Sequence, residues 1–481
     1  TGPPAPHKRC MKRLLTTLVL LAATASYAAP PNILFISIDD LNDWTGGLGG
    51  HPQAKTPHMD AVAARGNLFT NAHCQAPVCA PSRFSLMSGR YPSATGLYFL
   101  NPETRAPGPY MTLTLLPQRF AKEGYRVQAV GKLFHSRMNQ SVFGALDGYG
   151  GSNGGFGPIP KKKISQPHGH PLWDWGAYPD SDQRMPDHKT ATWAADKLAS
   201  MPGDKPFFLG VGFYRPHVPM FAPKAWFDRF PLDTIKTPKV NADDLDDLSP
   251  YAIALTREKH VAPTHEWMTE SGEWPHAVQA YLASIAFADH CLGIVLDALE
   301  KSPHRDNTLV VVWSDHGFHL GEKNRWAKRS LWENGTRVPI IIARPGETKA
   351  QRIGAPVGLI DLYPTLLDLC GFTPDPELEG RSLRPLLEQP DAPWDRPIRT
   401  TFGPGNHSLR DADWRYIRYH DGSEELYDLR NDPNEWTNLA GESVHANRLA
   451  TFRKRLPQTE HPILGKGSTG HNAFEAARAK R

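Results

Sequence analysis

The stretch Asn32-Ile-Leu-Phe-Ile-Ser-Ile38, which runs directly into Asp39-Asp40, decides the fold. Seven consecutive apolar or β-prone residues predict a strand that is buried on both faces, as in a parallel sheet. The later segment Leu309-Val-Val-Val-Trp-Ser314 has the same character and also ends in an acid, Asp315. We therefore expect two central strands whose carboxyl ends both carry carboxylates.

Helical signals alternate with these strands. Thr56-Pro57 and Gly66 frame a first helix, and residues 277–300 carry a single apolar stripe of helical period. Shorter segments predict helices over 81–89 and 115–122 and strands over 125–130 and 207–212. This alternation predicts an α/β domain with a large, mostly parallel sheet sandwiched by helices.

The N-terminal residues differ from the rest. Residues 1–28 combine the charged Met11-Lys12-Arg13, a short apolar run over 14–25 and the small residues around Ser26-Tyr27-Ala28. We interpret them as upstream residues plus a signal peptide, since the apolar run is too short to span a membrane. The protein is expected to be exported, periplasmic or secreted, without a membrane anchor.

Two further regions are predicted beyond the leader. Residues 30–375 form the catalytic α/β domain, and a proline-rich stretch over 374–397 marks a boundary. In the C-terminal subdomain, residues 395–481, alternating segments flank a turn at Asp421-Gly422 and predict a small antiparallel sheet.

The charge balance argues against nucleic acid as a partner. The chain has 54 Lys and Arg against 50 Asp and Glu, and all four excess positive charges lie in residues 1–28. Without these residues 50 of each sign remain, so the body is neutral. A broad basic surface for DNA or RNA is therefore not expected.

The acidic strand ends predict a metal site. Carboxyl ends of parallel strands meet at one edge of a sheet, so Asp39, Asp40 and Asp315 should lie together. Three carboxylates at one place repel one another unless a cation holds them. A hard divalent ion with oxygen ligands, calcium, fits this set. Taken singly, each aspartate could instead be an ordinary helix cap.

The motif Cys79-Ala-Pro-Ser-Arg83 places a cysteine at the start of a predicted helix. The positive end of a helix binds anions and should depress the pKa of the thiol. Arg83 lies one turn further along and faces the same way. These features indicate a thiolate nucleophile or an anion site. A Cys74–Cys79 disulfide is the alternative in an exported protein.

The same motif, followed by Ser88-Gly-Arg-Tyr-Pro92, resembles the signature of the type I sulfatases of the alkaline phosphatase superfamily. The resemblance covers roughly residues 31–440. It implies an alkaline-phosphatase-like fold and conversion of Cys79 to formylglycine by a maturation enzyme. Three elements are similar to the iduronate-2-sulfatase-like branch: Gly131-Lys-Leu-Phe-His135, Arg215-Pro-His-Val-Pro219 and Trp326-Ala-Lys328.

The resemblance also implies a role for each site residue. One calcium ion would be held by Asp39, Asp40, Asp315, His316 and the matured Cys79. Arg83, Lys132 and Lys328 would neutralise charge on the nucleophile and the sulfate. His217 would protonate the leaving sugar oxygen, and His135 would act as the base. Considered alone, each histidine or lysine could be structural.

The implied reaction is hydrolysis of a sulfate ester on a sulfated, uronate-containing polysaccharide or oligosaccharide, either a glycosaminoglycan or an algal glycan such as ulvan. Two alternatives stay open. One is a phosphoesterase or phosphonate monoester hydrolase on the same scaffold. The other is a non-catalytic, exported glycan-binding protein in which Cys79 stays a thiol.

Residues 140–190 lack a clean period and predict a surface excursion that contacts substrate. Its aromatic residues Trp173, Trp175 and Tyr178 could stack on sugar rings or simply pin the excursion. Its lysines, 161–163, could bind a polyanion or belong to a solvated loop.

Overall fold

The computed structural model describes the chain except residues 4–29, 101–107, 166, 169, 257–260 and 480–481. The predicted signal peptide therefore lies outside the described residues. Residues Pro31–Arg481 form one compact unit.

The central sheet has seven strands in the order β12-β2-β11-β8-β1-β6-β4. Strands β8, β1, β6 and β4 run parallel, β12 runs parallel to β2, and β11 is antiparallel to both its neighbours. The mostly parallel sheet predicted from the sequence is thus confirmed. The strand bounds are β1 Asn32–Ile38, β2 Asn67–Phe69, β4 Arg126–Gly131, β6 Phe207–Phe213, β8 Thr308–Ser314, β11 Ile340–Ala343 and β12 Gln351–Ile353.

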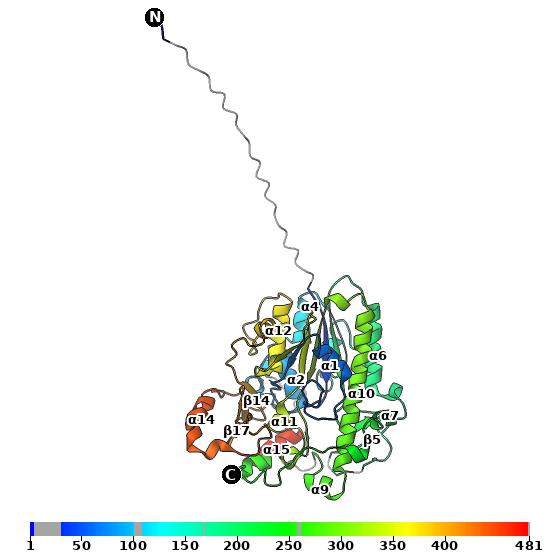
Figure 1. Ribbon diagram of the computed structural model, residues 1–481, viewed down its shortest axis with the longest axis vertical. Helices are drawn as coiled ribbons and strands as arrows, with labels where there is room; N and C mark the ends of the chain where they lie inside the picture. Colours follow the sequence, from blue (N-terminus) through cyan, green and yellow to red (C-terminus); the bar gives the residue numbers. More distant parts are fainter. Residues whose placement is uncertain (4–29, 101–107, 166, 169, 257–260, 480–481) are drawn as a thin grey trace. The chain divides into compact units, whose positions relative to one another are not determined.

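Alternate side chains of β1 enter two separate cores. Leu34, Ile36 and Ile38 pack with the helices of one face, whereas Ile33 and Phe35 pack with those of the other. Figure 1 shows the helices on the two sides of the sheet. The first face carries α1 (Pro57–Ala63), α6 (Pro186–Ser200) and α10 (Trp274–Lys301), and the second carries α2 (Cys79–Ser88), α4 (Leu116–Lys122), α5 (Met138–Phe143), α12 (Leu362–Leu369) and α13 (Arg384–Glu388).

Among the described residues, α10 alone is long and apolar enough to cross a membrane. However, 72% of its most apolar window is buried inside the body. Packing against the sheet and α6 therefore explains its composition. The predicted bounds, 277–300, miss only its first turn and its last residue.

The excursion over 140–190 is more ordered than its composition suggests. It contains β5 (Trp175–Ala177), which pairs in parallel with β7 (Met220–Ala222), and it ends in the first turn of α6. The sequence pattern did not predict α6, because Gly, Pro and aromatic residues precede it. Apart from 3-10 turns, the remaining short helices and strands are α3 (Pro92–Thr95), α7 (Lys224–Phe227), α8 (Pro250–Thr256), α9 (His265–Glu270), α11 (Glu333–Thr336), β3 (Ala72–His73), β9 (His319–Leu320), β10 (Trp326–Ala327) and β13 (Val357–Gly358).

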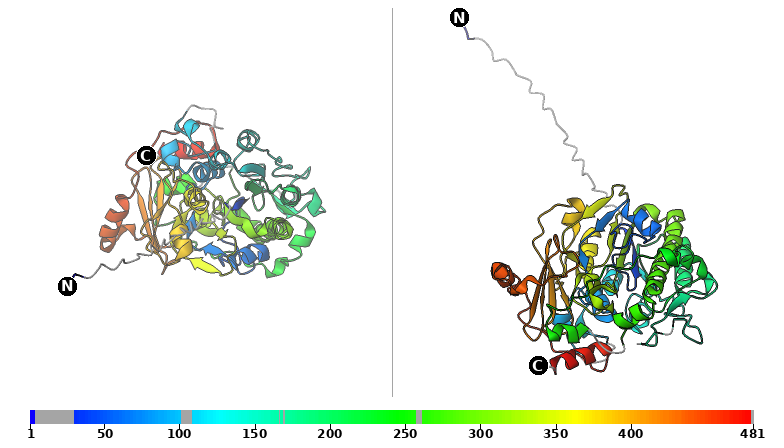
Figure 2. Two further views of the ribbon diagram at one scale, coloured as in Figure 1. Left: turned by 90° about the horizontal axis from the view of Figure 1, so that it is seen from above. Right: turned by 60° about the horizontal axis from the view of Figure 1, so that its bottom comes forward.

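The C-terminal region forms the predicted antiparallel sheet, seen in orange in Figure 2. Its four strands are paired in chain order, with the helices α14 (Ala446–Arg453) and α15 (Thr469–Arg478) after them. The strands are β14 Ile398–Thr401, β15 His407–Arg410, β16 Trp414–Arg418 and β17 Glu424–Asp428. Strand β14 is tied to the segment before α2, because Thr401 N donates to the Gln75 carbonyl at 2.9 Å.

Candidate active site

Four adjacent parallel strands deliver the candidate residues to one edge of the sheet. The register pairs Ile38 of β1 with Ser314 of β8 and with Phe213 of β6. The segments that follow these strands therefore leave the sheet side by side, and β4 lies next to β6. They carry Asp39 and Asp40 after β1, Asp315 and His316 after β8, Lys132 after β4 and His217 after β6.

Three fully buried carboxylates meet there, as predicted. The Asp40 amide donates to Asp315 Oδ1 at 3.1 Å, and His316 Nε2 lies 3.3 Å from Asp40 Oδ1 and 3.5 Å from Asp315 Oδ2. His316 Nδ1 donates to the Gly317 carbonyl at 3.0 Å. In the neutral ring Nε2 then carries no hydrogen, so its lone pair faces the carboxylates.

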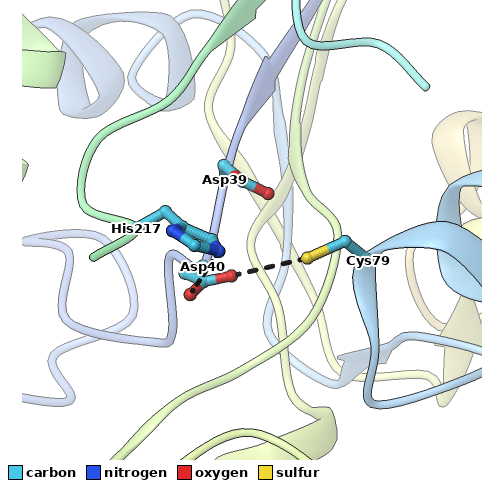
Figure 3. Close-up of side chains that lie close together, drawn as sticks. All are labelled: Asp39, Asp40, Cys79 and His217. Atoms are coloured by element: carbon cyan, nitrogen blue, oxygen red, sulfur yellow. Dashed lines mark hydrogen bonds and ion pairs between the residues drawn. The ribbon is translucent and has the colours of Figure 1, made fainter. Parts of the chain in front are cut away.

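Cys79 is the first residue of α2 and its side chain points into this cluster (Figure 3). Its Sγ lies 3.2 Å from His316 Nε2, 3.9 Å from Asp40 Oδ1 and 3.5 Å from Lys328 Nζ. Within the described residues Cys74 and Cys79 are both free thiols, so the disulfide alternative is wrong.

The expected depression of the Cys79 pKa is also wrong. Burial raises the pKa of the thiol to about 12, and the charges of Lys132 and Lys328 offset this only in part. The cysteine is 3% exposed, which explains why desolvation outweighs the helix end. An unmodified Cys79 is therefore protonated at neutral pH and is a poor nucleophile.

Arg83 is completely buried and joins two of the carboxylates. Its Nε donates to Asp315 Oδ2 and its Nη2 to Asp39 Oδ1, both at 2.9 Å. Its Nη1 donates to the Lys132 carbonyl at 2.6 Å. The guanidinium thus fixes the positions of the carboxylates and of the segment after β4.

Two lysines complete the charge balance. Lys132 Nζ donates to Asp39 Oδ2, and Lys328 Nζ lies 2.7 and 2.8 Å from the two oxygens of Asp40. Burial lowers the pKa of each lysine, but the acidic neighbours, led by Asp39 for Lys132 and by Asp40 for Lys328, together outweigh burial and raise the pKa. Three carboxylates thus face three cations, and the cluster is neutral before any metal or substrate is added.

The two candidate histidines, His217 and His135, differ in their contacts with the buried cluster. His217 Nδ1 donates to the Val218 carbonyl at 2.6 Å, and Nε2 lies 3.8 Å from Asp40 Oδ2. Burial, reinforced by Lys328, holds the His217 pKa well below its usual range. In His135, burial and then Lys132 lower the pKa to about 3. Within the described chain no hydrogen bond joins His135 to Cys79.

A cavity of about 200 Å³ opens onto the nucleophile position and is lined by Asp40, Cys79, His135, His217, Lys328 and part of the excursion. Trp173 and Trp175 are both only 2% exposed. Trp175 Nε1 donates to Glu273 at 2.9 Å, and Trp173 packs on Phe318. Both tryptophans therefore pin the excursion, and Trp173 also contributes to the lining of the cavity.

Comparison with known proteins identifies the family. Residues 31–372 match the family model described as Sulfatase, and residues 321–461 match the one described as N-sulphoglucosamine sulphohydrolase, C-terminal. The chain belongs to the sulfatase family, whose members hydrolyse sulfate esters. The family resemblance seen in the sequence is thereby confirmed.

Two relatives and one solved structure illustrate the similarity. A sulfatase of Formosa agariphila is 40% identical, covering 89% of this chain and 87% of that protein. Human iduronate 2-sulfatase is 30% identical, covering 72% of this chain and 70% of its own. The phosphonate monoester hydrolase of Agrobacterium radiobacter matches with a TM-score of 0.70 at 22% identity, over 88% and 94% of the two chains, which shows a shared fold.

Three residues of this sulfatase that support the site were missed from the sequence. Asp187, in the first turn of α6, accepts hydrogen bonds at 2.8 Å from the amides of Tyr214 and Arg215, just before His217. Asn139 accepts from the amides of Leu133 and Phe134 at 3.0 and 2.8 Å, just before His135. Tyr281 of α10 donates to the Asp40 carbonyl at 2.6 Å. The apolar period places Tyr281 on the buried face of α10, but nothing local identifies its partner.

The donor chemistry of this sulfatase site fits a divalent metal ion. One ligand atom from each of Asp40, Cys79, Asp315 and His316 lies within 4.8 Å of the others, and a second such group replaces the last two with Asp39 and His217. Each group contains two carboxylates, whose oxygens suit calcium, together with Cys79 and one histidine nitrogen.

Proposed function

We propose that this sulfatase, with Cys79 converted to formylglycine, removes sulfate from a sulfated, uronate-containing polysaccharide or oligosaccharide. The glycan would be a glycosaminoglycan or an algal glycan such as ulvan. The observation that carries the proposal is the place of Cys79, whose Sγ contacts His316 and Lys328 at the floor of the cavity. The similarity to human iduronate 2-sulfatase supports the uronate.

In this proposal Asp39, Asp40, Asp315, His316 and the matured residue 79 hold one calcium ion. When bound, the ion supplies positive charge beside the nucleophile and the sulfate. Arg83 pairs with both Asp39 and Asp315 and holds the two carboxylates in position for that ion. Because Arg83, Lys132 and Lys328 already balance the three carboxylates, a divalent ion leaves the site with excess positive charge for an anionic substrate.

His217 is the proposed acid for the leaving sugar oxygen, and His135 is the proposed base. Both rings line the cavity and are neutral before substrate binds, because burial lowers the pKa of each. A bound sulfate favours the imidazolium form of His217, since a nearby anion raises the pKa of a histidine. His217 can then give that proton to the departing oxygen.

Export and maturation belong to the same proposal. Polymeric glycans occur outside the cell, which agrees with interpreting residues 1–28 as a leader for a periplasmic or secreted enzyme. The maturation enzyme that makes formylglycine would be its second partner. The division into residues 30–375 and 395–481 stays a prediction.

The phosphoesterase or phosphonate monoester hydrolase alternative is less well supported. Its solved neighbour shares the fold at 22% identity, whereas the family model and the relatives above are sulfatases. Membership of an enzyme family also counts against the non-catalytic glycan binder.

Peptide mass spectrometry across Cys79, on protein made together with the maturation enzyme, tests the proposal. We expect formylglycine at position 79 and sulfate release from a sulfated uronate oligosaccharide. Cys79→Ala should fold but lose roughly 10³-fold or more of the activity, because the nucleophile is gone. An active preparation that contains only free thiol at position 79 would refute the mechanism. Faster turnover of an aryl phosphate than of the matching aryl sulfate would favour the alternative.

A further inference from the structure

Positive charge is concentrated in one part of the excursion. Residues 148–173 contain no aspartate or glutamate, but they contain Lys161, Lys162 and Lys163. Since the body as a whole is neutral, these lysines form a local surplus of one sign of charge. The sequence leaves open whether they bind a polyanion or belong to a solvated loop, and the structure supplies the observations that decide between the two.

The lysines belong to a loop that begins and ends at the cavity containing Cys79. We call residues 157–165 the lysine loop. Phe156, directly before this loop, and His170, shortly after it, both line the cavity of about 200 Å³. The centroid of the Phe156 ring lies 4.5 Å from that of the His217 ring. The lysine loop therefore projects from the rim of the candidate active site.

The lysine loop is anchored on both sides of its lysines. Before them, Arg215 Nη2 donates to the Gly157 carbonyl at 3.3 Å. After them, the buried Asp174 accepts from the amides of Ile164 and Ser165, each at 2.9 Å. Anchored ends restrict the backbone of the loop, so it loses less entropy when a ligand binds.

The lysine side chains are free to meet a ligand. Lys161 and Lys162 are exposed, and neither makes a hydrogen bond or an ion pair with a residue that the structure describes. Lys163 is half-buried, and its Nζ donates to the Pro167 carbonyl at 3.3 Å. An ammonium has three donors, so this bond still allows Lys163 to bind an anion.

Lys163 connects the lysine loop electrostatically to the cavity rim. Burial, Arg329 and Lys163, in decreasing order, lower the pKa of His170. The charge of Lys163 is therefore felt at the rim, because salt screens exposed charges beyond about 8–10 Å. A sugar unit that leaves the cavity past His170 comes close to this lysine.

Apolar side chains flank the lysines. Ile159 and Ile164 are 59% and 45% exposed. An exposed basic loop with apolar neighbours can bind a sulfated glycan or an anionic membrane. The position of the lysine loop favours the glycan, because a chain whose sulfate lies at Cys79 lies beside the rim that carries the loop.

We propose that Lys161, Lys162 and Lys163 bind anionic groups of a sulfated glycan on sugar units beyond the one that reacts. This inference rests on the proposed function and adds to it a preference for chains over single sugars. An ammonium pairs with a sulfate or a carboxylate as a point charge, without a fixed geometry. Exposed ion pairs are individually weak and screened by salt, so the preference comes from several pairs together and falls with ionic strength.

Two substrates of different length test this preference. They are a sulfated monosaccharide and a hexasaccharide that contains it, prepared from heparin and from ulvan in turn. The readout is the hexasaccharide-to-monosaccharide ratio of kcat/KM, at low and at physiological salt, for the glycan that releases sulfate. In the wild-type enzyme we expect a ratio of about 10 or more that falls as salt is added, as three exposed ion pairs predict.

The double variant Lys161→Gln, Lys162→Gln should lower this ratio about 3-fold to 10-fold, through KM, and should weaken its dependence on salt. Lys161→Arg, Lys162→Arg should keep the ratio, because both charges remain. Lys205→Gln, Lys349→Gln is the matched control and should also keep it. It removes two exposed charges at the amino ends of β6 and β12, at the opposite edge of the sheet.

A wild-type ratio near unity, an unchanged ratio in the double variant, or an equal loss on both substrates would overturn the inference. Binding to vesicles of phosphatidylserine and phosphatidylcholine that the double variant loses, with the ratio unchanged, would assign the lysine loop to a membrane instead. Failure of every substrate to release sulfate contradicts the proposed function, so the two failures are distinguishable.

Discussion

Asp40 has a left-handed backbone conformation, with φ at 60°, although it is not a glycine. Two contacts hold it there. Its carbonyl accepts from the Tyr281 hydroxyl at 2.6 Å, and its amide donates to Asp315 at 3.1 Å. The hydroxyl also accepts from the Asn42 amide at 3.1 Å. The hydroxyl oxygen of Tyr281 therefore orients Asp40, a proposed calcium ligand, through the backbone. It makes no contact with the Asp40 carboxylate in these hydrogen bonds.

We expect Tyr281→Phe to weaken calcium binding about 10-fold, because groups that orient a ligand typically contribute 10-fold to 100-fold to metal affinity. Isothermal titration calorimetry of the chelator-treated protein with calcium measures this. Tyr416→Phe is the control, since it also removes one hydroxyl, which bonds to Glu424 in the C-terminal sheet. Equal calcium affinity in wild type and Tyr281→Phe would contradict the assignment.

At the scale of elements, two glycines allow Lys132 to turn from β4 into the site. Gly131 has φ at 73°, and a Cβ there would lie 1.9 Å from the Gly212 carbonyl oxygen on β6. A Cβ on Gly212 would lie 2.3 Å from the Lys132 carbonyl. Only glycine fits at this contact between the two strands.

Gly131→Ala should therefore destabilise the protein by about 1–3 kcal/mol and displace Lys132 from Asp39. Thermal unfolding measures the stability, and the rate of sulfate release measures the effect of displacing Lys132. The unfolding midpoint and the rate should both fall. Gly203→Ala, where an added Cβ meets nothing within 4 Å, is the control and should change neither. A Gly131→Ala variant with wild-type activity and stability would contradict this prediction, since it would show that β4 and β6 can move apart enough to accept the added Cβ.

The strand ends could be predicted from the sequence because their information is local. An apolar run followed by Asp39 or Asp315 specifies both the strand and the polar edge, and Cys79 lies at a recognisable helix start. The thiol pKa and the roles of Asp187 and Tyr281 could not be predicted, because they depend on burial and on residues distant in sequence. Whether Trp173 and Trp175 stack on sugar or pin the excursion could not be predicted for the same reason.

At the scale of the whole molecule, buried histidines couple stability to pH. His73 lies between the α/β body and the C-terminal sheet, and its Nε2 contacts Asn71 Oδ1 at 2.8 Å. Burial holds its pKa well below the usual 6.5. Because the folded pKa is depressed, the stability that the neutral ring contributes is present above pH 6.5 and is lost as the pH falls towards the folded pKa.

The stability advantage of wild type over His73→Gln should thus shrink by up to about 1.4 kcal/mol for each pH unit below 6.5. Denaturant unfolding of both proteins at several pH values between 7 and 5 measures the difference. Comparing the two proteins cancels the other titrating groups, including the buried acids. A difference that does not change with pH would show that the pKa of His73 is the same in the folded and the unfolded protein.

The burial of Cys79 also constrains when the protein can be matured. The residue belongs to the first turn of a packed helix and is 3% exposed, so a second enzyme has no access to its backbone or its sulfur in the native state. Under the proposed function, conversion and folding are competing rates acting on the same newly made chain. A molecule that folds before Cys79 is converted stays intact but inactive. The fraction of active molecules therefore depends on the rate of conversion relative to the rate of folding.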